Sequence, residues 1–247
     1  MDIIILIIAL FLGSIGSVSL AGLMLLLKND KLEKFSTWLM YLAGGTLLGA
    51  AFLGMIPKII SITDNTIVFY YITGGIMFFF IMEKVILWRS CHNKECERHI
   101  RTAVPIILIG DAFHNAMDGI VIAASFLTSG ELGIFATISV ILHEIPQELG
   151  DFGILIRGGL NRKKALFYNM LSGSTAIISG IIAYYTLETI SVLIPYVLAF
   201  SAASFIYIAL ADLIPEMHRK TSIKDSLLQI FLIFSGILII YLILKIK

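Results

Sequence analysis

Two short polar segments hold the residues of this chain that are best suited to chemistry. The first contains Asp111, His114, Asn115 and Asp118, which follow one another at i, i+3, i+4 and i+7. In an α-helix this spacing places the four side chains on one stripe. Imidazole, carboxylate and amide groups are ligands for divalent transition metals. The pattern therefore predicts that His114 and Asp118 chelate one ion, with Asn115 offset toward a second.

The second segment runs from His143 to Asp151. Its donor side chains are those of His143, Glu144, Gln147, Glu148 and Asp151. His143 and Gln147 lie one helical turn apart and share a face. Pro146 lacks a backbone N–H and is predicted to kink the helix, which would free backbone carbonyls for a cation or water.

The composition places both segments in a membrane protein. Hydrophobic residues form 58% of the 247, charged residues only 14%, and mean hydropathy is +0.96. A soluble domain carries roughly 25% charged residues. Ionisable groups inside a membrane are costly, so a bound cation is the favoured explanation for them. A polar stripe that packs against another without metal is the alternative. No basic run with interleaved aromatics suggests nucleic acid.

The chain is predicted to be an all-α polytopic membrane protein that forms a single transmembrane domain over residues 1–247. Crossing the hydrocarbon core takes about 20 residues. Eight spans are expected, at approximately 3–27, 36–57, 66–88, 104–127, 133–156, 165–186, 192–214 and 227–244.

The basic residues predict the orientation of these spans. Fifteen of the 18 lysines and arginines fall at 28–35, 84–101, 157–164 and 215–226, which are alternate connections. Positive charge concentrates on the cytosolic side of membranes. Both termini are therefore predicted to be extracytosolic, in the plasma or inner membrane of the cell.

A weak internal repeat predicts a 3+2+3 arrangement. Small residues at 43–46 precede Met55-Ile56-Pro57, and small residues at 201–204 precede Leu213-Ile214-Pro215 at the same spacing. Five helices separate the copies, so they run in opposite directions. Inverted repeats that flank a central polar site are typical of transporters.

The polar motifs resemble those of the ZIP (Zrt-, Irt-like protein) family of divalent metal transporters. The pattern His114-Asn115-x-x-Asp118-Gly119, followed by His143-Glu144-x-Pro146-x-Glu148-x-Gly150-Asp151, is similar to the branch whose fifth helix reads H-E-x-P-H-E-x-G-D. Segments 43–49, 74–84 and 207–217 also look like parts of this family.

This resemblance implies a homodimer that moves metal into the cytosol by alternating access, with Zn²⁺ first and Fe²⁺, Mn²⁺ or Cd²⁺ also compatible. The metal is cargo, and no cofactor is expected. The implied ligands of one ion are His114, Asp118, His143 and Gln147, and those of a second are Asn115, Glu144 and again Gln147. Asp111, Glu148, Asp151, Ser172 and Thr175 would act around them or along the path. Gln147 departs from the His or Glu of relatives, and it is a poorer ligand.

The polar residues allow three other interpretations. An intramembrane metal hydrolase would need a second His four residues after His143, where Gln147 stands. A metal-gated sensor or passive channel would lack saturable uptake. Cys91, His92, Cys96 and His99 form a tempting cytosolic metal site, although their spacing matches no common zinc motif.

Overall fold

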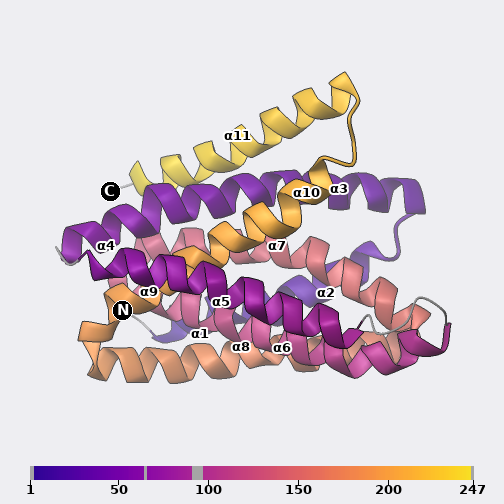
Figure 1. The fold of residues 1–247 in the computed structure, drawn as a ribbon, viewed down its shortest axis with the longest axis horizontal. Helices are drawn as coiled ribbons and strands as arrows, with labels where there is room; N and C mark the ends of the chain where they lie inside the picture. Colours follow the sequence, from indigo (N-terminus) through magenta and orange to yellow (C-terminus); the bar gives the residue numbers. More distant parts are fainter. Residues whose placement is uncertain (1–2, 64–65, 91–96, 246–247) are drawn as a thin grey trace.

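The structure, a computed structural model, describes residues 3–63, 66–90 and 97–245, and this part of the chain is helical without a β-strand (Figure 1). The helices are α1 (Ile3–Phe11), η1 (Leu12–Gly16), α2 (Ser17–Met24), α3 (Asn29–Gly49), η2 (Ala50–Met55), α4 (Ile56–Ile62), α5 (Ile67–Ser90), α6 (Glu97–Thr128), α7 (Gly130–Arg157), α8 (Arg162–Thr189), η3 (Ser191–Leu193), α9 (Ile194–Tyr207), η4 (Ile208–Leu213), α10 (Ile214–Met217) and α11 (Ile223–Lys245). The predicted fold class, an all-α polytopic membrane protein, is confirmed. Cys91, His92 and Cys96 lie outside the described residues, as does the side chain of His99.

The described elements join into eight long helical segments, of which seven are long and apolar enough to span a membrane. The exception is α7, which has the length but carries His143, Glu144, Glu148 and Asp151. The helix with the weakest membrane signal is thus one that holds the polar site. The first segment ends at Met24, three residues earlier than the sequence suggests, because Leu25–Leu27 turn toward α3.

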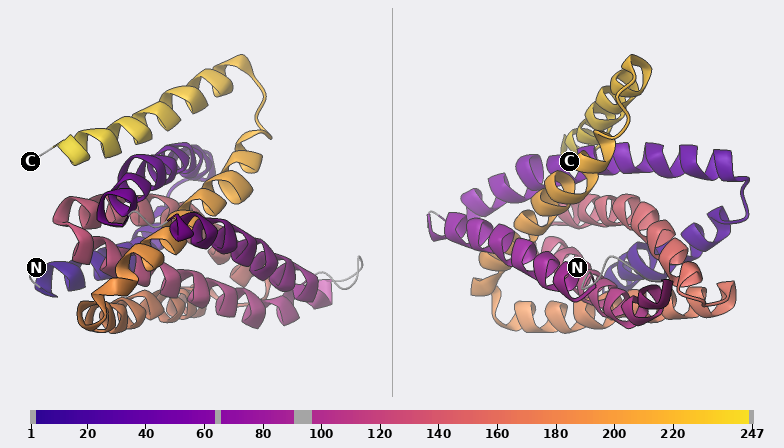
Figure 2. Two further views of the ribbon diagram at one scale, coloured as in Figure 1. Left: turned by 60° about the vertical axis from the view of Figure 1, so that its left-hand side comes forward. Right: turned by 45° about the vertical axis from the view of Figure 1, so that its right-hand side comes forward.

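The two predicted repeat segments share an unusual backbone feature. Each contains a six-residue π-helical stretch, η2 or η4, followed directly by Ile-Pro at Pro57 or Pro215. Their packing partners also correspond. Helix α11 lies along α3 at one edge of the bundle, and α5 lies along α9 (Figures 1 and 2). The third span of each repeat thus packs against the second span of the other repeat, as expected if the first three and last three spans are repeats.

The two site helices, α6 and α7, form a hairpin with a single residue between them. Ser129 has an extended backbone, and its side chain accepts a hydrogen bond from Leu132 N, which caps α7. Ser129 lies 15 residues after His114 and 15 before Glu144. At 1.5 Å per residue both side chains stand about 22 Å from the turn. The tight turn therefore sets the two polar segments at the same depth.

Helix α8 is fastened to α6 by small and hydroxyl residues. Thr175 Oγ1 donates to Ala112 O at 2.6 Å, and Ser179 Oγ donates to Ala116 O at 2.7 Å. Gly119 lets the backbones approach, because a Cβ there would overlap Ala176 O. Such close packing is how helices associate in lipid, where apolar burial gives little drive. Helices α6 and α8 are therefore expected to move as one body.

Packing differs between the two ends of the bundle. The main hydrophobic core contains Leu47, Ile122 and Phe135, and it fills the half that includes the α6–α7 turn. The other half holds a cavity of about 430 Å³, bounded by Met40, Glu83 and Glu216 among others. A salt bridge of 3.1 Å from Lys220 to Glu33 joins the chain after α10 to the start of α3 at this end. A second pocket, of about 480 Å³ and lined by Lys58, Thr128 and Ser191 among others, lies at the end of the α6–α7 turn, and His114 and His143 line only the first cavity.

Replacing Gly119 with alanine is expected to destabilise the protein by about 1–3 kcal/mol, because the added methyl group would push α8 away from α6. Thermal unfolding in detergent measures this loss. Gly74→Ala is the matched control, since nothing lies within 4 Å of a Cβ at that position. Equal melting temperatures for the two variants would contradict the proposed close contact.

Candidate metal centre

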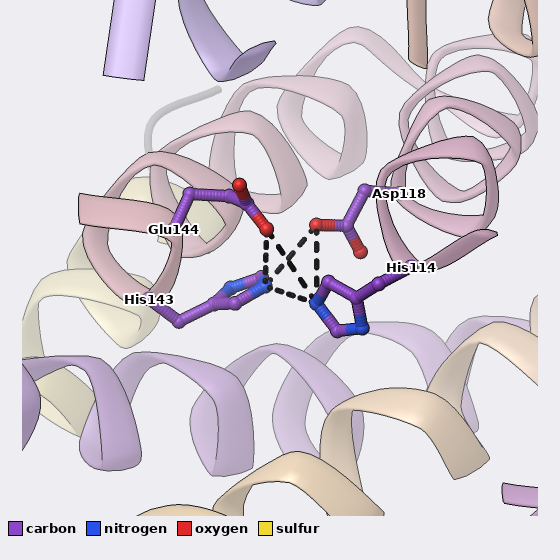
Figure 3. A group of neighbouring side chains, drawn as sticks. All are labelled: His114, Asp118, His143 and Glu144. Atoms are coloured by element: carbon purple, nitrogen blue, oxygen red, sulfur yellow. Dashed lines mark hydrogen bonds and ion pairs between the residues drawn. The ribbon is translucent and has the colours of Figure 1, made fainter. Parts of the chain in front are cut away.

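Four side chains from the two site helices converge on one point (Figure 3). His114 and Asp118 come from α6, and His143 and Glu144 come from α7. His143 Nε2 lies 3.1 Å from Asp118 Oδ2 and 3.3 Å from His114 Nε2. His114 Nε2 lies 3.5 Å from Glu144 Oε1 and 3.9 Å from Asp118 Oδ2, and His143 Nε2 lies 3.8 Å from Glu144 Oε1. Each residue thus offers one donor atom to a common centre.

These spacings match a tetrahedral metal site. Zinc binds imidazole nitrogen and carboxylate oxygen at about 2.0–2.2 Å, which places tetrahedral donors roughly 3.3–3.6 Å apart. Five of the six distances between the donor atoms run from 3.1 to 3.9 Å, and all four atoms lie within 4.8 Å of one another. Two nitrogen and two oxygen donors form a borderline ligand set that suits Zn²⁺ and its neighbours. We name this group of His114, Asp118, His143 and Glu144 the histidine cluster.

The far nitrogen of His143 is held so that the near one can bind metal. His143 Nδ1 lies 2.8 Å from Ser139 O, one turn earlier on α7. A carbonyl can only accept, so Nδ1 carries the proton and Nε2 presents a lone pair to the cluster. The ring of Phe205 lies edge-on to His143 with centroids 6.2 Å apart. The sequence did not single out Ser139, because the acceptor is its backbone carbonyl, which every residue type has.

Both carboxylates of the histidine cluster are buried without hydrogen bonds. Asp118 is 1% exposed and Glu144 is fully buried, and none of their four oxygens has a hydrogen-bond partner among the described residues. Both imidazoles lie within 4 Å of each carboxylate. A buried, unpaired carboxylate carries a desolvation penalty of several kcal/mol. A divalent cation at the centre of the cluster would remove this penalty.

The remaining predicted ligands lie elsewhere. The structure groups Glu144, expected at the second ion, with three of the four ligands expected for the first ion, His114, Asp118 and His143. The Asn115 amide nitrogen donates to Asp111 Oδ1 at 2.9 Å, and its buried Oδ1 has no hydrogen-bond partner among the described residues. Gln147 lines the cavity beside the cluster. A second ion held by Asn115, Glu144 and Gln147 stays a prediction.

The residues predicted to surround the site have distinct contacts. Ser172 Oγ donates to Asp111 Oδ2, whereas Thr175 donates to the backbone of α6. Asp151 lines the cavity together with Asp111. Glu148 is fully buried, and Asn169 of α8 lies beside its carboxylate.

The cavity reaches the histidine cluster through His114 and His143, which form part of its wall. Three acidic side chains line it farther out, those of Glu83, Asp212 and Glu216. Glu83 accepts a hydrogen bond from the Tyr207 hydroxyl. The sequence alone did not single out Tyr207, because a tyrosine in a membrane helix is usually a packing or interface residue.

Comparison with known proteins decides the family. The sequence profile described as "ZIP Zinc transporter" matches residues 89–244, which include the whole histidine cluster. The chain belongs to the ZIP family. This assignment confirms the resemblance seen in the two polar motifs, and it places the histidine cluster within the segment that the family shares.

Several characterised ZIP proteins align with the chain. Zinc transporter zipt-7.2 of Caenorhabditis elegans is 35% identical over 151 residues, which cover 60% of this chain and 33% of the relative. Zinc transporter ZIP13 of Danio rerio is 34% identical, and the alignment covers 40% of its length. Zinc transporter foi of Drosophila melanogaster is 39% identical, and the alignment covers 20% of its length. The alignments span 56% of this chain in both of these cases. The chain therefore spans less than half of the length of these relatives.

Replacing His143 with alanine removes one of four converging donors and is expected to weaken Zn²⁺ binding by more than 100-fold. Even losing an outer hydrogen-bond partner of a metal ligand typically weakens binding 10–100-fold. Equilibrium titration of the purified protein with Zn²⁺ measures the change. His218→Ala is the control, because His218 is exposed at the end of α10. Unchanged Zn²⁺ affinity in His143→Ala would exclude the histidine cluster as the binding site.

Proposed function

We propose that this ZIP protein carries divalent transition-metal ions, Zn²⁺ foremost, across the membrane into the cytosol. The observation that carries the proposal is a buried four-donor cluster at the inner end of a cavity that opens at one end of the bundle. The relatives named as zinc transporters support the choice of metal. Fe²⁺, Mn²⁺ and Cd²⁺ are chemically compatible with the same donors.

The position of the cavity supports an orientation. It opens at the end of the bundle where the helices meet the Lys- and Arg-rich connections, such as that between Met217 and Ile223. By the positive-inside rule this end faces the cytosol and both termini face outward, in a cell membrane. The packed core then closes the extracytosolic half. We infer that the described conformation is the one that releases metal inward.

Transport requires the ion to exchange water for protein ligands and then to leave them. In the histidine cluster the two imidazoles and two carboxylates replace hydration water. Gln147, Asp151 and Asp212 line the next stretch of the path and offer weaker, more hydrated positions. The tight pairing of α6 with α8 supports movement of these helices, together with α7, against a scaffold that includes α3 and α9. Alternating access would open the other end in turn.

We further propose that the protein works as a homodimer and belongs to the branch with the H-E-x-P-H-E-x-G-D pattern, on the residues from His143 to Asp151. The hydrolase alternative finds no support in the comparisons, since the family is one of transporters. Saturable uptake would separate a carrier from a channel or sensor.

Liposomes that contain the purified protein are expected to take up Zn²⁺ with saturable kinetics. A His143→Ala, Glu144→Ala double variant should lower the initial rate to that of empty liposomes, because half of the cluster is lost. His218→Ala should keep the original rate, since that side chain is exposed and lies away from the cluster. Uptake that survives intact in the double variant would refute the proposed path.

Exchanging Gln147 for glutamate is expected to lower the apparent KM and the maximal rate together. The new carboxylate would stand at the cavity wall beside the cluster and hold the departing ion more strongly. Uptake measured over a range of Zn²⁺ concentrations separates the two parameters. Gln147→Met, which is neutral and of similar length, controls for the change of side chain. Equal kinetics for Gln147→Glu and the original protein would show that position 147 does not contact the moving ion.

A further inference from the structure

A single side-chain hydrogen bond links the metal-bearing helices to the helices beside them. Ser139 Oγ of α7 donates to Thr46 O of α3 at 3.3 Å, and both residues are fully buried. The hydroxyls of Ser172, Thr175 and Ser179 also reach a neighbouring helix, but they tie α8 to α6. Among the described residues, the Ser139–Thr46 bond is therefore the one side-chain hydrogen bond between the group α6, α7 and α8 and the pair α3 and α9.

Ser139 differs in this respect from other hydroxyl residues in the helices. Ser14, Thr128 and Thr137 each donate to the carbonyl four residues earlier in their own helix. That choice is the ordinary one for a hydroxyl residue inside a helix. For Ser139 the corresponding carbonyl is Phe135 O, and the hydroxyl turns to α3 instead. Its position is thus set by the contact between two helices.

The acceptor stands where the backbone of α3 changes into the π-helical η2. At this junction the Ala50 N–H is shared between Thr46 O and the next carbonyl. At the far end of η2 the Ile56 N–H bonds Ala51 O, five residues earlier instead of four. A carbonyl oxygen has two lone pairs, so Thr46 O, which receives only a shared backbone donor, has room for the Ser139 hydroxyl. The junction is a defined docking point on α3.

A stripe of α7 uses this docking point. Phe135, Ser139 and His143 follow one another at intervals of one turn, so they share a face of the helix. The Phe135 ring lies on Gly54 of η2, where a Cβ would come within 2.2 Å of the ring. Apolar packing of this kind is non-directional, whereas a hydrogen bond requires a particular distance and angle. The Ser139–Thr46 bond therefore fixes the depth of His143 against α3.

The second repeat has an equivalent junction whose serine is unpaired. At the start of η4 the Ile208 N–H is shared between Ser204 O and the next carbonyl. Ser204 stands as far before Pro215 as Thr46 stands before Pro57. Its hydroxyl is buried and has no hydrogen-bond partner among the described residues. In transporters with inverted repeats the two halves take equivalent positions in turn as access alternates. A docked first junction therefore marks one of two end states.

We propose that Ser139 is a positioning residue whose hydroxyl docks α7 on the junction of α3 and η2 and stabilises the conformation with the closed extracytosolic half. Since it needs α6, α7 and α8 to move against α3 and α9, this role rests on the proposed function. When these helices move, the bond to Thr46 breaks, and the hydroxyl can return to Phe135 O in its own helix. The carbonyl of Ser139 meanwhile keeps its contact with His143.

The test measures how often the extracytosolic half opens. Ala136 is fully buried and lies two turns before His143 on the same face of α7, so a thiol there becomes reactive when that half opens. The reporter is the full chain in detergent with Ala136→Cys, and with Cys91→Ser and Cys96→Ser to remove the native thiols. The measured quantity is the rate of its reaction with a cationic methanethiosulfonate.

Adding Ser139→Ala to this reporter should raise the reaction rate about three- to tenfold. Loss of one hydrogen bond typically shifts an equilibrium by this factor. Thr137→Val is the matched control, because it removes a hydroxyl that is bonded within α7 itself, and it should leave the rate unchanged. Equal rates with and without Ser139→Ala would overturn the proposal.

A second reporter and metal binding separate docking from a general loosening of the protein. Met40→Cys places a thiol in the wall of the inward cavity, and Ser139→Ala should not raise its reaction rate. The Kd for Zn²⁺ should also stay unchanged, because alanine keeps the carbonyl that orients His143. An equal rise at both reporters, or a weaker Zn²⁺ affinity, would contradict the docking role. These rates need no metal gradient, so they are informative even if the uptake experiment shows no transport.

Discussion

The structure depends on keeping four carboxylates in the interior of a helical membrane bundle. Lipid offers them no water, and the described core offers them no lysine or arginine. A divalent cation bound between the helices would neutralise two of them. This requirement explains why histidines, amides and hydroxyls gather on the facing stripes of α6, α7 and α8, while the outward faces of the same helices are apolar.

Holding donors about 3.3 Å apart on two different helices demands a rigid frame. The one-residue connection at Ser129 fixes the depth of α6 against α7, and the hydroxyl groups of Thr175 and Ser179 fix α8 against α6. Ser139 supports the frame twice, since its carbonyl orients His143 and its hydroxyl donates to Thr46 O of α3 at 3.3 Å. The latter bond joins the site helices to the neighbouring repeat segment.

The two halves of the bundle differ in packing on either side of the histidine cluster. A dense apolar core separates the histidine cluster from the end near the α6–α7 turn, and an acidic cavity connects it to the opposite end. The π-helical stretches η2 and η4 stand at equivalent positions of the two repeats. Such stretches often mark functional positions in helices, because they interrupt the regular hydrogen-bond ladder. In this protein η2 joins α3 to α4 and η4 joins α9 to α10, and these two segments flank the site.

The sequence by itself determined the membrane class, the eight helical segments and the two ligand-bearing stripes, because hydropathy and helical spacing are local properties. It also indicated the family, since the motifs from His114 to Gly119 and from His143 to Asp151 are specific. Only the tertiary structure decided which donors meet. It placed Glu144 with the two histidines and Asp118, turned Asn115 toward Asp111, and left Gln147 at the cavity wall. The physical reason is that convergence depends on the rotation and depth of one helix against another. Those are set by contacts such as Gly119 with Ala176 and by the turn at Ser129, which no spacing within a single helix reveals.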